Sequence, residues 1–319
     1  MILSIIVPVY NVEKYLEKCV RSTQVQDVPS SEYEVIMIND GSPDNSLAIA
    51  ERLAAELPNV KVFSQKNQGL SAARNSGMTY AKGDYYMFLD SDDWISENCL
   101  GSIIKKLRDE SPDVLAICAC NEYLEGPKIR KTYHDESVIS GVQHMLDGIE
   151  YCAPFGIWRA EFLRTYKLSF FEGIFHEDEE FTPRAYYKAK KVSRLGNLVY
   201  HVFQNPKSIT RSFNPKKGFD LIKIVCPHLS SFYEEVTEPE YKKLLDTRIA
   251  LLFNNGLNSC KNAEKEIIEK LNLLCFENRK LFIHLLHSSK IKYKIEGVLF
   301  LMFPKHVMAI YKFIQKFNS

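Results

Sequence analysis

In the stretch Phe88-Leu89-Asp90-Ser91-Asp92-Asp93-Trp94, an apolar segment runs directly into three carboxylates. The apolar part has the character of a buried strand, and the end of a strand is where an open α/β sheet presents its ligands. Carboxylates at alternate positions there suit a hard divalent cation that also holds a diphosphate. Because Asp and Ser also cap helices, and the segment from Ile95 to Arg108 has a helical pattern, capping is the alternative explanation.

Outward from this stretch, short apolar runs alternate with helical patterns through the first 120 residues. The runs are rich in Val and Ile and predict buried strands at Leu3–Val7, Val35–Ile38, Val60–Phe63, Tyr85–Leu89 and Val114–Ala119. A helical pattern follows the second run, with Ser42 or Asp44 as its expected cap. This alternation is typical of βαβ units, so we expect an α/β fold with a mostly parallel central sheet flanked by helices.

After residue 121 the pattern loosens. The elements expected there are a turn, a capped short helix, a helix and a strand, at Glu125-Gly126-Pro127, Ser140, Asp178–Lys188 and Leu198–Phe203 respectively. From about residue 218 to the end the periodicity is almost entirely helical. We therefore place a soft boundary near residue 215, between an α/β part and a helical part.

Composition excludes several classes of protein. The chain has 319 residues, 45% of them hydrophobic and 25% charged, and a net charge of +1. Such a balance gives no general basic field, so no nucleic-acid partner is expected. The eight cysteines form no CxxC pair, which predicts neither a zinc motif nor a disulfide framework and fits a reducing, cytoplasmic compartment. No stretch reaches the roughly 18 apolar residues of a spanning helix, and the apolar N-terminus is too short for a signal peptide.

Polar clusters follow four predicted elements. They are Pro8-Val9-Tyr10-Asn11, Asn39-Asp40-Gly41-Ser42, the segment Asn67–Gly77 and the carboxylates from Asp90. Pro8 cannot donate a ladder hydrogen bond, so we expect the first strand to stop there. Alone, each cluster has a plainer explanation, since Asp40 can be a turn acid and Arg74 a solvated surface residue. Together, at successive strand ends, the clusters predict a nucleotide site.

The set of motifs resembles the GT-A-fold glycosyltransferases of family 2, which use nucleotide-sugar donors and invert the anomeric centre. The resemblance rests on residues 8–11, 39–42, 69–77 and 89–93 and covers roughly residues 1–210. It implies a GT-A catalytic domain over 1–215, with a nucleotide-binding half (1–120) and an acceptor half (121–215). Residues 216–319 then form a helical C-terminal region that associates with a membrane or with a second copy as a homodimer.

For the donor, the resemblance implies a UDP-sugar. In relatives the position of Asp40 accepts the N3–H of uracil, and that of Arg74 approaches a base oxygen. Uracil offers a donor flanked by acceptors, so a carboxylate and a guanidinium match its edge, whereas cytosine would present an acceptor to the carboxylate. The donor-binding residues implied by the resemblance are Pro8, Val9, Tyr10, Asn11, Asp40, Ser71, Arg74, Asp90 and Ser91.

The resemblance also implies a metal ion, Mn²⁺ or Mg²⁺, bridging the two phosphates as a Lewis acid. Asp92 is the expected direct ligand. His201 is a candidate third ligand, although a single His beside a strand is often a satisfied core residue. Asp93 either binds the metal through water or caps the following helix, and we favour capping.

The stretch His176-Glu177-Asp178-Glu179 carries the expected catalytic base. Inverting transfer needs one carboxylate near the acceptor hydroxyl, and the resemblance assigns that role to Asp178. Glu177 then helps to hold the acceptor or the sugar. The alternative is that these acids only complement a helix dipole.

Two further segments offer candidate contacts with the substrates. Val202 and Phe203 stand where many relatives have Tyr and Arg, which weakens any diphosphate contact from that strand and leaves Lys207 and Arg211 as alternatives. Trp158 suits either stacking on a sugar or core packing, and packing is the stronger expectation.

The last thirty residues carry six lysines and one acid, Glu296. Val307, Ile310, Tyr311 and Ile314 repeat at helical spacing, with lysines near the opposite side. This pattern predicts an interfacial helix drawn to anionic lipid at the inner face of the plasma membrane. A helix packed on the rest of the protein is the alternative.

Taken together, the sequence predicts a metal-dependent inverting glycosyltransferase that moves a sugar from a UDP-sugar to a hydroxyl of a glycan or lipid-linked acceptor. A sugar nucleotidyltransferase is less favoured, because its glycine-rich entry loop with a following Lys is missing. A catalytically inactive GT-A-like nucleotide-binding or scaffolding subunit is the other alternative.

Overall fold

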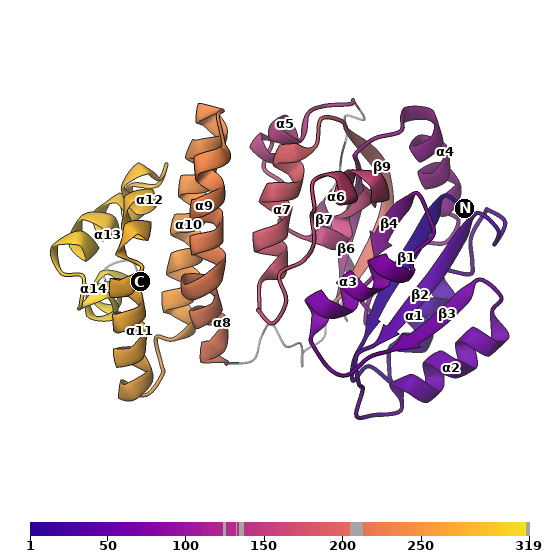
Figure 1. The fold of residues 1–319 in the computed structure, drawn as a ribbon, viewed down its shortest axis with the longest axis horizontal. Coiled ribbons are helices and arrows are strands. Elements are labelled where there is room, and N and C mark those ends of the chain that lie inside the picture. Colours follow the sequence, from indigo (N-terminus) through magenta and orange to yellow (C-terminus); the bar gives the residue numbers. More distant parts are fainter. Residues whose placement is uncertain (124–125, 132, 134–136, 205–212, 317–319) are drawn as a thin grey trace. The chain divides into compact units, whose positions relative to one another are not determined.

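The computed structural model describes residues 1–123, 126–131, 133, 137–204 and 213–316 (Figure 1). The chain folds as two compact units, one of residues 1–173 and 181–208 and the other of residues 174–180 and 209–319. The expected division near residue 215 stays a prediction of domain organisation. The two units differ from this division in that the second begins at residue 209 and also includes the segment 174–180.

The first unit is built on a single mixed sheet. In the described part of the chain it has nine strands in the order β3-β2-β1-β4-β8-β6-β9-β5, with β7 paired to β6. The strands are β1 Leu3–Val9, β2 Tyr33–Asn39, β3 Val60–Ser64, β4 Tyr85–Phe88, β5 Trp94–Ile95, β6 Val114–Tyr123, β7 Gly126–Lys131, β8 Gly156–Arg159 and β9 Val192–Phe203. The strands β3, β2, β1 and β4 run parallel, as do β6 and β9, and the remaining pairs are antiparallel. The expected α/β fold with a mostly parallel sheet is confirmed for this unit.

The helices associated with this unit connect and cover its strands (Figure 1). They are α1 Leu16–Ser22, α2 Ser46–Glu56, α3 Leu70–Tyr80, α4 Leu100–Glu110, α5 Gly141–Leu146, the 3-10 turn η1 Ala153–Phe155, α6 Ala160–Thr165 and α7 Glu177–Lys188. Ser140 caps α5 as expected, since its hydroxyl accepts from the Gln143 N–H. For α2 the N-cap is Asn45, and Asp44 instead accepts from the Ser46 N–H. Helix α7 begins in the second unit and continues in the first.

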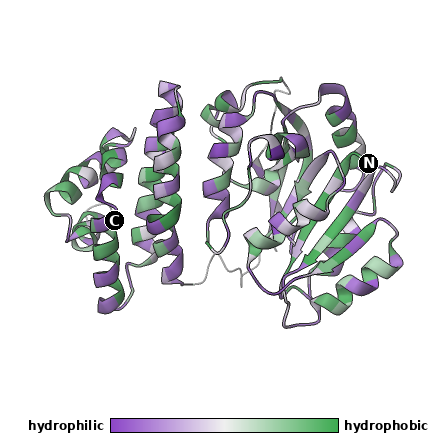
Figure 2. Cartoon of the chain, viewed as in Figure 1, coloured by the Kyte–Doolittle hydropathy of each residue, from purple (hydrophilic) through white to green (hydrophobic). Residues whose placement is uncertain are grey.

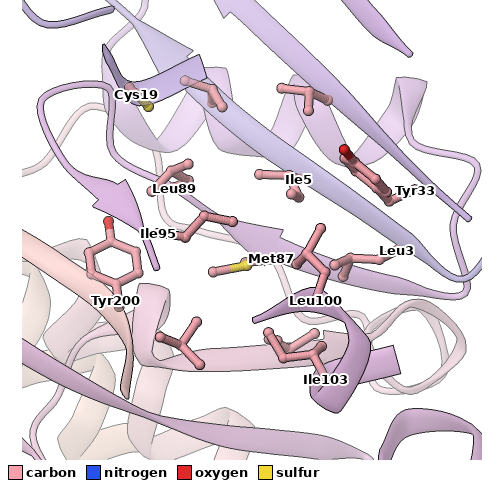
Figure 3. Close-up of a cluster of buried hydrophobic side chains, with 14 of the residues drawn as sticks. Leu3, Ile5, Cys19, Tyr33, Met87, Leu89, Ile95, Leu100, Ile103 and Tyr200 are labelled. Atoms are coloured by element: carbon pink, nitrogen blue, oxygen red, sulfur yellow. The ribbon is translucent and has the colours of Figure 1, made fainter. Parts of the chain in front are cut away.

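The core explains why these strands and helices form. Odd-numbered residues of β1, among them Leu3 and Ile5, pack with Met87, Leu100 and Ile103 in one apolar cluster (Figure 3). Residues of the opposite face pack against α3, which includes Ala73. The sheet is therefore buried on both faces, as near-continuous apolar strands require.

Glycine permits the close approach of α3 to the sheet. A Cβ atom on Gly77 would lie 2.3 Å from Cγ2 of Ile6. A side chain at this position would therefore force α3 away from β1.

The predicted end of the first strand at Pro8 was wrong. β1 continues to Val9, and Pro8 pairs with Ile38 of β2. The backbone N–H and C=O groups of Ile6 point toward β4, and those of Pro8 point to the same side. The Ile6 carbonyl accepts from the N–H of Leu89, which is already beyond the end of β4. The nitrogen of Pro8, which carries no hydrogen, therefore lies past the end of β4, where no strand of the described residues offers an acceptor for it.

The helix expected from Ile95 was also placed too early. Ile95 pairs with Tyr200 in the two-residue strand β5, and α4 begins only at Leu100. The N–H groups of Cys99, the residue before α4, and of Leu100 both donate to Oε1 of Gln26, which is distant in sequence. Asp93 therefore does not cap this helix.

Trp158 is fully buried in β8, with its indole N–H donating to the carbonyl of Ala153 and its ring packed against Phe181. Core packing is thus the correct alternative for this residue. The turn predicted at Glu125-Gly126-Pro127 falls partly outside the described residues, which include Gly126 and Pro127 as the start of β7.

In the residues that the structure describes, the second unit consists of helices and short connections. Its further elements are α8 Pro215–Asp220, the π-turn η3 Leu221–Val225, α9 Cys226–Glu235, α10 Pro239–Ser259, α11 Lys265–Glu277, the 3-10 turn η4 Arg279–Leu281, α12 Phe282–His287, α13 Ile291–Met302 and α14 Val307–Gln315. A buried polar network joins three of them. His284 of α12 bonds to Asp246 of α10 at 2.6 Å and to Ser230 of α9 at 2.8 Å.

The apolar face predicted to meet a membrane is mostly packed in this unit. Val307, Met308 and Tyr311 of α14 are buried in the helical core with Phe300 and Leu271. An exposed apolar stripe lies instead on α13, and much of the α13 ribbon has the green colour of hydrophobic residues in Figure 2. No helix in the described residues is long and apolar enough to cross a bilayer.

Candidate functional site

Three neighbouring strands bring their carboxyl ends together. Because β1 lies between β2 and β4 in a parallel arrangement, Tyr10, Asp40 and Asp90 follow adjacent strand ends. Tyr10 is 45% exposed and Asn11, in the left-handed region at φ 54°, is also exposed. Pro8 and Val9 are buried, so of this motif only the last two side chains face solvent.

Asp40 organises the loop before α3. Its carboxylate accepts from the side chain of Gln65 at 2.8 Å and from the N–H groups of Gln68 and Gly69 at 2.9 and 2.7 Å. The side chain of Asn67 donates to the Asp40 carbonyl. Asp40 is only 2% exposed, so its visible role is to hold the entry of α3 against the end of β2.

Arg74 is not the solvated residue that its position suggests. It is 1% exposed and donates through Nη2 to Oδ1 of Asp90 at 2.8 Å. Its guanidinium carbon lies 5.2 Å from the ring centre of Phe170. The buried cation of α3 is thus directed to the carboxylates that follow β4.

Burial and neighbouring negative charge raise the pKa values of two carboxylates in this cluster, Asp92 and Asp93. Burial, with the Asp90 charge, raises the pKa of Asp92 to about 6. Burial, with Asp90 and Asp92, raises the pKa of Asp93 well above its usual range. A divalent cation at this place would relieve the repulsion, and carboxylate oxygens are the ligands that Mg²⁺ and Mn²⁺ prefer.

Each carboxylate has a different surrounding. Asp90 accepts from the guanidinium of Arg74, whereas the buried Asp93 accepts from the Phe203 N–H at 2.8 Å. The hydroxyl of Tyr200 accepts from the Asp90 N–H at 3.0 Å and also bonds to Asp93. Asp92 is half-buried and is the member best suited to bind a cation.

His201, the candidate third metal ligand, has a hydrogen-bond partner at each ring nitrogen, and its part in the site of Asp92 stays a prediction. Its Nε2 lies 2.7 Å from Oγ of Ser96, and its Nδ1 lies 2.6 Å from Oε1 of Glu122. Its ring stacks on Trp94, at 5.6 Å between ring centres. Both ring nitrogens are therefore engaged by groups other than Asp92.

The acids at the start of α7 divide into two pairs. Glu179 forms an ion pair with Arg248, although burial raises the pKa of Glu179. Glu180 is buried with Nδ1 of His228 at 3.5 Å from its carboxylate. Glu177 and Asp178, the predicted catalytic pair, are half-buried in the first turn of the helix.

Among the remaining predicted residues, Ser71 and Ser91 are buried. The Ser71 hydroxyl has no hydrogen-bond partner among the described residues, so it remains available to a ligand that reaches it. Lys207 and Arg211 lie outside the described residues. Gln65 and Tyr200 were missed as site residues, because no local pattern shows that they bond to the site carboxylates.

Comparison with known proteins shows the family of the chain. The sequence profile of glycosyl transferase family 2 matches residues 4–163. The chain belongs to glycosyl transferase family 2. This family 2 chain is 32% identical over 260 residues to EpsH of Bacillus subtilis (strain 168), covering 78% of the chain and 74% of EpsH.

Two solved structures share the fold of this family 2 protein. Residues 1–349 of Staphylococcus aureus TarS, in complex with UDP-GlcNAc, superpose with a TM-score of 0.79 at 21% identity, covering 100% of the chain and 93% of that structure. TarS is a poly(ribitol-phosphate) β-N-acetylglucosaminyltransferase, and the sequence alignment spans 35% of the whole protein at 30% identity and 62% of the chain. The mannosyltransferase PcManGT of Pyrobaculum calidifontis, with GDP-Man and Mn²⁺, gives 0.56 at 13% identity, covering 97% of the chain and 86% of that structure.

The hydrogen bonds of Asp40 generate a prediction about stability without ligand. In Asp40→Asn one carboxylate oxygen becomes an amide donor, so a loop donor loses its acceptor at a cost of about 1–3 kcal/mol. We expect a melting temperature several degrees lower in the absence of nucleotide, measured by differential scanning calorimetry. Asp109→Asn, which changes an exposed helical ion pair, should stay within about 0.5 kcal/mol of the wild type. An unchanged melting temperature for Asp40→Asn would restrict Asp40 to a role in ligand binding.

Proposed function

We propose that the protein transfers a sugar from a UDP-sugar to a hydroxyl group of a glycan or lipid-linked acceptor, with inversion at the anomeric carbon. The observation that carries this proposal is the cluster at the end of β4, where buried Arg74 compensates Asp90 and Asp92 remains for a cation. Such a cluster beside exposed Tyr10 suits a nucleoside diphosphate with a metal ion.

The donor end of the proposal rests on Asp40, Ser71 and Arg74. A carboxylate has about four acceptor positions, and Asp40 uses three for the loop, so one remains for the N3–H of uracil. The buried hydroxyl of Ser71 supplies a further polar group on α3. The complex of the structurally similar TarS with UDP-GlcNAc supports the choice of uracil.

Asp92 is the proposed ligand of the metal ion. This residue would hold Mn²⁺ or Mg²⁺, and the ion would neutralise charge on the departing diphosphate. Mn²⁺ in the distantly similar mannosyltransferase supports a cation but does not select between the two metals.

Asp178 is proposed as the general base, with Glu177 holding the acceptor or the donor sugar. Asp178 takes the proton of the acceptor hydroxyl while the hydroxyl oxygen forms a bond to the anomeric carbon. The bond from the anomeric carbon to the diphosphate oxygen breaks at the same time. The ion pair of Glu179 with Arg248 and the contact of Glu180 with His228 support this choice, because both acids have partners within the helical unit.

Nucleotide selectivity tests the donor proposal. UDP with Mn²⁺ at about 100 times Kd should stabilise the full chain by about 2.7 kcal/mol, which shifts the melting temperature by roughly 5 °C. CDP, GDP and each nucleotide without metal should give clearly smaller shifts in a thermal-shift assay. A larger shift with CDP than with UDP would contradict the role of Asp40, and no shift with any nucleotide would favour an inactive scaffold.

The base assignment has its own test. Asp178→Asn should lower kcat about 10²–10⁴-fold in a UDP-release assay, because the acceptor proton loses its base. UDP affinity of this variant, measured by calorimetry, should stay within about threefold of the wild type. Asp109→Asn serves as the matched control with full activity, and a nearly active Asp178→Asn would move the base to Glu177.

We further propose that α13 contacts the anionic inner face of the plasma membrane. Its apolar side chains at Ile291, Ile295, Val298, Leu301 and Met302 are between 48% and 74% exposed. These positions recur along one side of the helix, and exposed Lys290, Lys294 and Lys305 flank them. An apolar stripe edged with lysines complements both the interior and the charge of such a membrane.

Vesicle pelleting tests this surface. The double variant Ile295→Asn/Val298→Asn should bind vesicles containing phosphatidylglycerol about tenfold less than the wild type, since two apolar contacts are lost. Leu273→Asn, at an exposed apolar residue of α11, should bind like the wild type. Equal pelleting of the double variant would contradict the proposal, and a concentration-dependent dimer lost in that variant would assign the stripe to a second copy instead.

A further inference from the structure

A compact group of metal-ligand atoms lies at the ends of β6 and β9. Cys120 and Glu122 are two residues apart on β6, so they share a face of the strand. The parallel pairing of β6 with β9 sets His201 opposite Cys120. One ligand atom from each of the three residues lies within 4.8 Å of the others.

The distances within the group are short. Nδ1 of His201 lies 3.3 Å from Sγ of Cys120 and 2.6 Å from Oε1 of Glu122, and Sγ lies 3.4 Å from that oxygen. With zinc bonds of about 2.0–2.3 Å, the edges of a tetrahedron measure about 3.3–3.6 Å. The two distances from Sγ of Cys120 already have this length within about 0.3 Å, whereas the distance between Nδ1 of His201 and Oε1 of Glu122 must increase by about 0.7 Å.

The chemistry of the three atoms favours zinc over the hard cations. Thiolate, imidazole and carboxylate are all established types of zinc ligand, whereas Mg²⁺ and Mn²⁺ prefer oxygen alone. The three carboxylates after β4 form an oxygen site of the second kind, so the two groups select different metals.

The surroundings of His201 orient it as a ligand. Ser96 Oγ lies 2.7 Å from Nε2, so an Nε2–H that donates to it leaves the lone pair of Nδ1 directed at Cys120 and Glu122. Metal-binding histidines almost always have such a partner on the second nitrogen. The stacked ring of Trp94 fixes the plane of the imidazole.

Burial of the group suits a site with one open position. Cys120 is fully buried, whereas the side chains of Glu122 and His201 are 19% and 16% exposed. The protein would thus supply three ligands to a metal ion, and a water molecule on the exposed side would complete a coordination number of four.

We infer that Cys120, Glu122 and His201 bind one zinc ion that joins β6 to β9. The ion would act on structure, because Phe203, two residues beyond His201, donates its N–H to Asp93. Zinc at this position therefore holds the strand end that supports the carboxylate cluster. The inference is independent of the donor, the acceptor and the base proposed above.

The test uses the full chain, stripped of metal with a chelator and titrated with ZnCl₂ in a calorimeter. One ion should bind per chain, and the melting temperature should rise on binding. Cys120→Ser, Glu122→Gln and His201→Gln should each weaken zinc binding at least tenfold. Because Glu122 is partly exposed, its variant keeps the test valid if a core substitution prevents folding.

Two controls separate this site from its neighbours. Cys118→Ser, at another buried thiol of β6, should retain zinc affinity. Asp92→Asn should also retain it, since Asp92 belongs to the oxygen site. Ser96→Ala should weaken zinc binding about 10–100-fold through the lost orientation of His201.

Cobalt gives a readout that a merely structural role would not produce. Co²⁺ added to the stripped chain should show a thiolate charge-transfer absorption that disappears in Cys120→Ser and persists in Cys118→Ser. Absence of this absorption, or zinc affinity that is unchanged in both Cys120→Ser and Glu122→Gln, would overturn the inference and leave a hydrogen-bonded Glu–His–Cys group.

Discussion

The structure depends on a buried positive charge that keeps like charges together. Asp90, Asp92 and Asp93 lie within four residues, and burial together with the charge of Asp90 raises the pKa values of Asp92 and Asp93. Arg74 reaches Asp90 from α3 while being almost completely buried itself. A charge removed from such a pair would leave its partner uncompensated in a region of low dielectric constant, which is far more costly than the loss of a surface ion pair.

The rest of the sheet follows from this arrangement. Asp93 needs its own partner, and the Phe203 N–H at the end of β9 provides it. The Tyr200 hydroxyl bonds to the Asp90 N–H, and its ring packs within the core cluster (Figure 3). β9 is therefore bound to the end of β4 through side chains, although the two strands are not neighbours in the sheet. The polar groups of the site and the apolar core stabilise the same strand.

Asp40 illustrates how one residue serves both folding and binding. Its bonds to Gln65, Gln68 and Gly69 fix the loop that leads into α3, the helix that carries Arg74. The loop thus fixes where α3 begins relative to the end of β2. A substitution at Asp40 consequently acts on the position of Arg74 even when no ligand is present.

The sequence by itself determined the βαβ alternation of the first unit, the residues at the strand ends and the membership of family 2. These features are encoded locally, because burial and chain direction repeat over a few residues and leave a periodic pattern. The polar residues after each strand could be predicted for the same reason, since parallel strands bring their carboxyl ends to one edge.

Only the tertiary structure decided which of these residues meet. The two-residue strand β5 exists because Ile95 and Trp94 pair with β9, and α4 starts at Leu100 because Gln26 accepts its first N–H groups. Arg74 bonds to Asp90, and His201 bonds to Glu122 and Ser96, over sequence separations that no local pattern predicts. Such contacts depend on the order in which strands join the sheet, and that order is fixed by the packing of the whole unit rather than by neighbouring residues in the chain.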